Sequence, residues 1–172
     1  CGTTELINKA VEASPKNLFL TFGMNDLEAV DSDAKAFKKD YPGIDFELRM
    51  GNYDEIEQWV LEGTVDCGFL HTPVDPKLET IHLANDRLLV TLPEGHPLAD
   101  CDRFPVKALE NDPFILPKTG SHTDVEPIFR KHNIEPDIRF STFDDYAIMS
   151  MVESGLGISI LPELILKRVP YR

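Results

Sequence analysis

Short apolar runs alternate along this chain with segments whose apolar residues recur every three or four positions. In the first half, this pattern predicts strands at residues 18–22, 45–50 and 65–70. A helix is predicted at residues 27–40, and a second one follows Tyr53 and ends at Gly63. Strands that alternate with helices in this way are typical of parallel sheets with crossover helices.

The second half repeats the pattern with different residues. Apolar runs predict strands at residues 88–92, 114–116, 137–140 and 157–161. Helices are predicted at residues 123–131 and 144–154, with Asp144 as the N-cap of the latter. The chain is therefore expected to contain two α/β units that follow each other.

Two segments carry the most specific information. Residues 88–99 form an apolar strand that ends at Pro93 and turns through Glu94-Gly95-His96-Pro97. Residues 151–162 form the end of a helix, stopped by Gly155, that leads into a buried strand. In this order and at this distance, the two segments resemble the effector-binding domain of LysR-type transcriptional regulators, and the likeness runs from about residue 17 to about residue 163.

The resemblance implies a fold of the type 2 periplasmic-binding-protein class. That fold is α/β, with two Rossmann-like lobes whose mixed, mainly parallel sheets are joined by a hinge. It implies the end of a linker helix at residues 1–14, lobe I at residues 15–93, lobe II at residues 94–165 and the start of a return hinge at residues 166–172. Family members return to the first lobe through roughly 30 further residues, so we expect the C-terminal part of the domain to be missing.

Composition narrows the choice of partners. The chain has 172 residues, 42% of them hydrophobic, which is enough to bury a substantial core. Its net charge of −13 repels phosphate backbones, so DNA contact is expected only through an N-terminal winged helix-turn-helix that lies outside this sequence. No apolar run reaches membrane-spanning length, and no membrane partner is expected.

The cysteines indicate the compartment. Cys1, Cys67 and Cys101 are odd in number and lack metal-ligand spacing, which favours a reducing cytoplasm over a disulfide framework. A lipid-anchored extracytoplasmic binding protein also begins its mature chain with cysteine, which keeps a second reading of Cys1 open. Cys67, in an apolar strand, is expected to be inert, and the acids around Cys101 disfavour its thiolate.

Candidate effector-binding residues lie where strands end and helices begin. In open α/β sheets these strand ends line the crevice that receives ligands. Four such loops occur, at residues 23–26, 51–53, 120–123 and 142–144. The candidate residues are Met24, Asn25, Asn52, Tyr53, His71, Gly120, Ser121, His122, Thr123, Thr142 and Phe143.

Several candidates have a simpler structural alternative. Asn25 and Asp144 can act as helix caps, as can Ser121 or Thr123. His71 can be a satisfied structural histidine and Phe143 a core residue. Met24 and Asn25 also stand where the resembled family usually presents Ser or Thr to a ligand carboxylate, which weakens the expectation of a simple carboxylate effector.

No catalytic motif competes with this reading. The sequence lacks a nucleophile elbow, a phosphate-binding Gly-Lys-Ser loop, a dinucleotide fingerprint and a His-Glu-x-x-His pair. Acids that invite a search for catalytic pairs are better explained as caps or solvated faces; they are Asp54, Asp66, Asp124 and Asp145. We therefore predict no enzymatic activity, no catalytic residue, no cofactor and no metal.

The helix at residues 27–40 raises the question of a protein partner. Its apolar stripe could cover its own sheet, but in the resembled family the equivalent helix and the following strand pack against a second subunit. The resemblance thus implies a homodimer, with a tetramer of the full-length protein as an alternative. The expected interface residues are Val30, Ala34, Phe37, Tyr41, Phe46 and Leu48.

Two other functions share the same scaffold. An extracytoplasmic solute-binding protein of a transporter would use the same clamp, and an upstream signal peptide would distinguish it from a regulator. An enzyme on this scaffold should show a nucleophile or an acid pair among the strand-end residues, and none was found. The preferred hypothesis is an effector-sensing domain of a bacterial LysR-type regulator.

Overall fold

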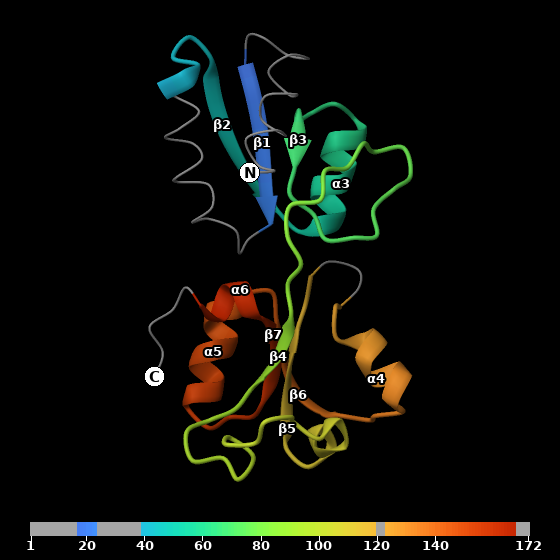
Figure 1. Cartoon of the computed structure of the whole chain (residues 1–172), viewed down its shortest axis with the longest axis vertical. Helices are drawn as coiled ribbons and strands as arrows, with labels where there is room; N and C mark the ends of the chain where they lie inside the picture. The colour runs from blue at the N-terminus through green and yellow to red at the C-terminus, as the bar shows by residue number, and fades with distance from the viewer. Residues whose placement is uncertain (1–16, 24–38, 120–122, 168–172) are drawn as a thin grey trace. The chain divides into compact units, whose positions relative to one another are not determined.

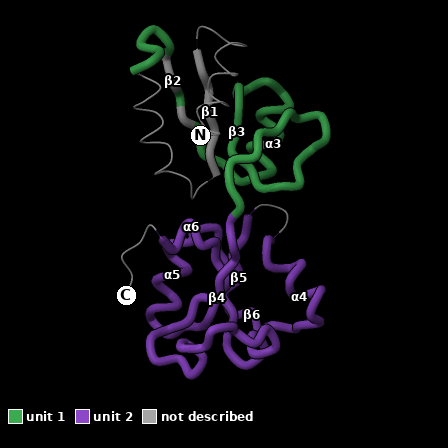
Figure 2. The backbone as a smooth tube through the Cα atoms, viewed as in Figure 1, with its two compact units in different colours: residues 1–85 green, residues 86–172 purple. Residues whose placement is uncertain are grey.

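A computed structural model describes residues 17–23, 39–119 and 123–167, with the backbone alone at residues 17–23, 45, 46 and 48 (Figure 1). The chain divides into two compact units, Cys1–Asn85 and Asp86–Arg172 (Figure 2). The linker helix expected at residues 1–14 lies outside the described residues. So does the helix expected at residues 27–40, apart from residues 39 and 40, which are helical.

The first unit contains a three-stranded parallel sheet in the order β2-β1-β3. Its strands are β1 (Asn17–Gly23), β2 (Asp45–Gly51) and β3 (Cys67–Gly68). The strands and the parallel pairing predicted from the sequence are confirmed, but β3 is shorter than the predicted residues 65–70. The amide of Val65 donates to the Trp59 carbonyl at the end of the preceding helix, so it is not available to the sheet.

Helix α3 (Tyr53–Leu61) crosses from β2 to β3, and local signals define both of its ends. Asn52 and Glu55 form a capping box in which each side chain accepts the backbone N–H of the other residue. Ile56 is fully buried. Gly63 ends the helix as predicted, because its φ of 68° lets the Thr64 amide reach back to the Trp59 carbonyl.

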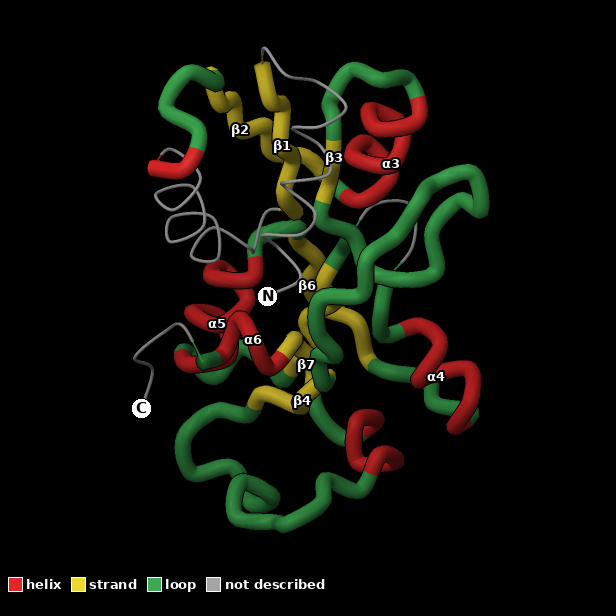
Figure 3. The backbone as a smooth tube through the Cα atoms, turned by 45° about the horizontal axis from the view of Figure 1, so that its top comes forward, coloured by secondary structure: helices red, strands yellow, loops and turns green. Residues whose placement is uncertain are grey.

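The second unit holds two pairs of strands (Figure 3). The predicted strand at residues 114–116 is β5 (Pro113–Pro117), which pairs in parallel with β6 (Asp137–Thr142). β4 (Leu88–Thr91) pairs antiparallel with β7 (Ser159–Pro162), so the sheets are mixed. A bridge between Phe114 and Ile158 joins β5 to the segment that enters β7.

β4 lies in the second unit, whereas the sequence analysis placed it in the first lobe. Residues 88–92 were assigned to lobe I, whereas β4 belongs to the unit that begins at Asp86. The reason is packing: Val90 and Leu92 pack against a core that includes Phe114 and Ile160. The turn at residues 94–97 follows β4 within the second unit, where the His96 amide donates to the Pro93 carbonyl.

Four short helices complete the described part of the second unit. They are the 3-10 helix η1 (Val106–Glu110), α4 (Glu126–His132), α5 (Asp145–Glu153) and α6 (Glu163–Leu166). α4 begins later than the predicted residue 123, because the Thr123 hydroxyl accepts the Glu126 amide at the start of the first turn. Asp144 caps α5 as predicted, and Gly155, at φ 72°, ends it with the Leu156 amide bonded to the Met151 carbonyl.

Two core clusters lie on opposite sides of β5 and β7, because neighbouring strand residues point to opposite faces. Phe114 and Ile160 belong to one cluster, and Ile115 and Leu161 to the other. Figure 1 shows α4 on one side of these strands and α5 with α6 on the other. The first cluster contains Leu109, Phe114, Val125, Phe129, Ile134, Ile158 and Ile160; the second contains Ile115, Ile148, Met149, Val152, Leu161 and Ile165.

Residues 86 and 87, at the start of the second unit, bind the first turn of α6. We call these contacts the ion-pair clasp; it consists of Asp86, Arg87, Glu163 and Leu164. The Arg87 guanidinium donates to both oxygens of Glu163, from Nε to Oε2 at 2.9 Å and from Nη2 to Oε1 at 2.6 Å. The Asp86 carboxylate accepts the Leu164 amide at 3.2 Å, and the Arg87 carbonyl accepts the Glu163 amide. Pro162 has no side-chain capping group, so these two acceptors satisfy the first amides of α6.

The clasp predicts a specific loss of stability in acid. Hydrogen bonds from Arg87 lower the pKa of Glu163 to about 2, compared with about 4.3 for an unperturbed glutamate. A glutamate with a lowered pKa stabilises the fold above its unfolded-state value and loses that contribution as the pH falls towards 2. We expect Glu163→Gln to lower the free energy of unfolding at pH 6. This loss should become smaller as the pH falls from about 4.5 to 2.

Urea unfolding at several pH values tests this prediction. Glu94→Gln serves as a control, because Glu94 is exposed and forms no ion pair within the described part of the chain. If the difference in the free energy of unfolding between the parent chain and Glu163→Gln stays constant from pH 6 to pH 2.5, the pKa of Glu163 is not lowered by this contact.

Candidate ligand-binding site

In the first unit, three predicted site residues gather at the carboxyl ends of β2 and β3. Asn52 and Tyr53 follow β2 directly, and His71 lies three residues beyond β3. The rings of Tyr53 and His71 meet edge to face, with centroids 4.4 Å apart and an interplanar angle of 89°. His71 is exposed, and its Nδ1 lies 3.3 Å from the Thr72 carbonyl oxygen.

In the second unit, the corresponding edge carries Lys118, Thr142 and Phe143. The Lys118 amide donates to the Thr142 carbonyl at 2.9 Å, which holds the ends of β5 and β6 together. The Lys118 ammonium lies 5.7 Å from the centre of the Phe143 ring, and Phe143 is 45% exposed. Phe143 is therefore available to a ligand, and the alternative that it is a core residue is wrong.

Capping explains part of the predicted site. The Asn52 oxygen accepts the Glu55 amide, and the Asp144 oxygen Oδ1 accepts the amides of Tyr146 and Ala147. Thr123 is buried and its hydroxyl accepts the Glu126 amide, while the Thr142 hydroxyl accepts the Asp144 amide. The capping alternative for Asp144 is confirmed. Thr123 accepts a first-turn amide of α4 but is not its N-cap, which is Val125.

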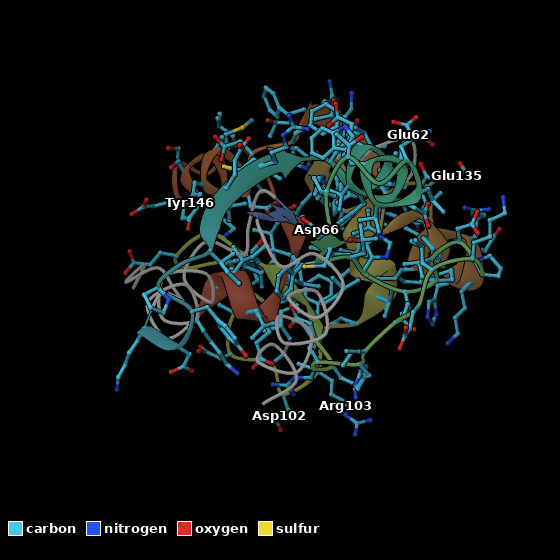
Figure 4. The ribbon with its side chains drawn as sticks, turned by 90° about the horizontal axis from the view of Figure 1, so that it is seen from above. Glu62, Asp66, Asp102, Arg103, Glu135 and Tyr146 are labelled. Carbon is cyan, nitrogen blue, oxygen red and sulfur yellow. The ribbon has the colours of Figure 1, made fainter. Side chains whose placement is uncertain are left out.

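The two helix ends near these residues already carry acids. Asp54 and Glu55 occupy the first turn of α3, and Asp145 follows the Asp144 cap of α5. These carboxylates offset the partial positive charge that a helix dipole places at its N-terminus. The chain as a whole is acidic, and Figure 4 shows exposed acids such as Glu62 and Glu135 reaching outward.

Lys118 was missed by the sequence analysis. It lies in the loop predicted to follow the strand at residues 114–116, but a loop lysine carries no distinctive spacing. The signal that was present is its position, one residue beyond the end of a parallel strand.

Several predicted residues lie outside the described part of the chain. For the effector site these are Met24, Asn25, Gly120, Ser121 and His122. For the dimer interface they are Val30, Ala34 and Phe37; Phe46 and Leu48 are described only as backbone of β2, and Tyr41 is half-buried. The convergence of all four loops on one ligand stays a prediction.

Cys67 is buried, as expected. Burial, together with the nearby Asp66 carboxylate, raises the pKa of the Cys67 thiol to about 12, which leaves it protonated and unreactive at neutral pH. Cys101 is exposed. Within the described residues, no group of three or more His, Cys, Asp or Glu side chains is placed to hold a metal ion, and no helix there is long and apolar enough to cross a membrane.

Comparison with known families decides the class of protein. The family model described as the LysR substrate binding domain matches residues 34–172. The chain belongs to the LysR substrate-binding domain family. The fold class predicted from the sequence, α/β of the type 2 periplasmic-binding-protein kind, is confirmed by this membership and by the solved structures that the chain resembles.

Curated relatives of this LysR-family chain are transcriptional regulators. YvbU of Bacillus subtilis, an uncharacterised HTH-type regulator, is 30% identical over 134 residues, which cover 78% of this chain and 46% of the relative. The activator CmpR of Synechocystis is 30% identical over 128 residues, covering 73% of this chain and 42% of the relative. The chain spans about half the length of the curated relatives it matches.

Solved structures of the same family share the fold. HinK, a LysR family regulator from Pseudomonas aeruginosa, has a TM-score of 0.76 at 25% identity, covering 92% of this chain and 58% of HinK. The regulatory domain of CcmR from Synechocystis, solved in complex with 2-PG, has a TM-score of 0.82 at 24% identity, covering 91% of this chain and 77% of that domain.

Proposed function

We propose that this domain binds a small-molecule effector at the carboxyl ends of its strands. The observation that carries the proposal is the pair of contacts at those ends, Tyr53 with His71 in the first unit and Lys118 with Phe143 in the second. His71, Lys118 and Phe143 are exposed and therefore accessible. Related domains have been solved with small molecules, namely CcmR with 2-PG, QuiR with shikimate and BenM with benzoate.

The bound effector would act by favouring one arrangement of two lobes, with β4 in the second of them. A ligand shifts such an equilibrium only through its different affinity for the two arrangements. DNA would be bound by an N-terminal winged helix-turn-helix of the full-length protein, since a net charge of −13 makes this domain unsuited to binding the polyanionic backbone of DNA. The whole protein would be a cytoplasmic transcriptional regulator without enzymatic activity or cofactor.

We further propose that the domain forms a homodimer through Tyr41 and the strand β2. Among the described strands, β2 is at the edge of its sheet in the order β2-β1-β3, where a second chain can pack. Sedimentation at tens of micromolar should show a dimer, and a monomer at that concentration would contradict this part of the proposal.

A thermal-shift screen of metabolites tests effector binding. A ligand at 100 times its Kd stabilises the folded state by about 2.7 kcal/mol, which raises the Tm of a domain of this size by about 5 to 10 °C. His71→Ala and Phe143→Ala should reduce that shift while leaving the Tm of the free protein nearly unchanged, because both side chains are exposed.

Matched controls are available for both variants. His82 and Phe140 are also exposed, and neither lies at the carboxyl end of a strand. In His82→Ala and Phe140→Ala, the ligand should raise the Tm by as much as it does in the parent chain. If all four variants respond alike, the proposed site is misplaced.

A further inference from the structure

We propose that Lys118 anchors an acidic group of the effector, so that the ligand is a small organic acid carrying a carboxylate or a phosphate. The inference rests on the proposed function, since it names the ligand class and a specificity residue of the same site. Carboxylates and phosphates share the chemistry that an ammonium recognises, namely negative charge on oxygen acceptors.

The backbone holds Lys118 in place. Its amide donates to the Thr142 carbonyl at 2.9 Å, so the residue is tied to the end of β6 while it follows the end of β5. Its ammonium lies 5.7 Å from the Phe143 ring centre. A cation and an exposed aromatic face thus lie together at the ends of two paired strands.

Among the described residues, Lys118 differs from most cations of the second unit in having no carboxylate partner. Five of those cations lie within 3.5 Å of an acid; they are Arg87, Lys107, Arg130, Arg139 and Lys167. Within the described residues, no carboxylate lies within ion-pair distance of Lys118. Its charge is therefore not neutralised by an ion pair with any described residue and can be used by a ligand.

Other sources of positive charge at the strand ends are weak. The first turns of α3 and α5 carry acidic residues, and the caps Asn52 and Asp144 already accept amides there. The net charge of −13 also opposes the approach of an anion. An acidic effector therefore needs a local cation, and Lys118 supplies one.

The two side chains suit different parts of one molecule. An ammonium offers three donors to a carboxylate or phosphate. Phe143, at 45% exposure, offers an apolar face to the body of the ligand, beside the acidic group. Small acids with an apolar or ring-shaped body match this arrangement.

The test compares acids with their neutral analogues on the full chain. Thermal shift and calorimetric titration are run with 2-PG, with benzoate against benzamide, and with shikimate against methyl shikimate, inside a library of common metabolites. We expect acids to raise the Tm and their neutral analogues not to. Lys118→Gln should weaken the Kd of a binding acid by about 10- to 100-fold, the loss expected for one charge-assisted hydrogen bond.

Lys131→Gln is the matched control, because Lys131 is an exposed lysine on α4 with no carboxylate partner among the described residues. It should change the Kd less than twofold, and the Tm of each free variant checks folding. If only neutral compounds bind, the acid class is wrong and the proposed function stands. If Lys118→Gln binds the acid as tightly as Lys131→Gln does, Lys118 is not the anchor. If no compound binds, both proposals fail.

Discussion

Replacing Phe114 by alanine should lower the free energy of unfolding of the second unit by about 3–5 kcal/mol. The Phe114 ring is fully buried and meets the Phe129 ring edge to face, with centroids 5.3 Å apart. Phe114 also joins β5 to the segment before β7, so the cavity would open at the centre of a core cluster. Urea unfolding, monitored by circular dichroism, measures this loss of unfolding free energy.

Phe140→Ala is the matched control for this substitution. Phe140 lies on β6 of the same unit and is 41% exposed, so its truncation removes little buried surface. We expect a loss below about 1 kcal/mol for this variant. Equal losses for the two phenylalanines would show that Phe114 is not at the centre of the core.

Replacing Gly157 by alanine should destabilise the same unit by about 3 kcal/mol through a backbone clash. A Cβ on Gly157 would lie 2.4 Å from the carbonyl oxygen of Pro113. That oxygen accepts the Ile158 amide, and the Ile115 amide donates to the Ile158 carbonyl, both at 2.9 Å. The strands cannot separate enough for the methyl group without losing these two bonds.

Gly43→Ala controls for the general effect of replacing a glycine. A Cβ on Gly43 would meet no atom within 4 Å, and Gly43 does not have a positive φ. This variant should be as stable as the parent or slightly more so, because alanine restricts the unfolded chain. A Gly157→Ala variant with stability close to that of Gly43→Ala would contradict the close approach of β5 and β7.

The elements that the sequence predicted well are those determined by neighbouring residues. β2 and β5 follow from short apolar or alternating runs, and the ends of α5 follow from Asp144 and Gly155. Long-range pairing could not be predicted in this way. β4 pairs with a strand about 70 residues later, and only the shared core around Phe114 shows why.

In the candidate site, too, features set by neighbouring residues can be predicted from the sequence, and features set by long-range contacts cannot. Asn52 was predicted as a ligand group, yet the sequence Asn52-Tyr53-Asp54-Glu55 already contained a capping-box signal, and the structure shows that box. Lys118 could not be found from spacing, because its significance comes from the side chains around it. The edge-to-face contact of Tyr53 with His71 likewise joins the first turn of α3 to the loop after β3.

Amide hydrogen exchange tests most directly whether an effector binds at these strand ends. The acid that raises the Tm most is added to the full chain, and exchange is followed by mass spectrometry. We predict slower exchange in peptides covering residues 51–56 and residues 140–146, with no change at residues 94–104. Protection found only away from these strand ends would contradict the account.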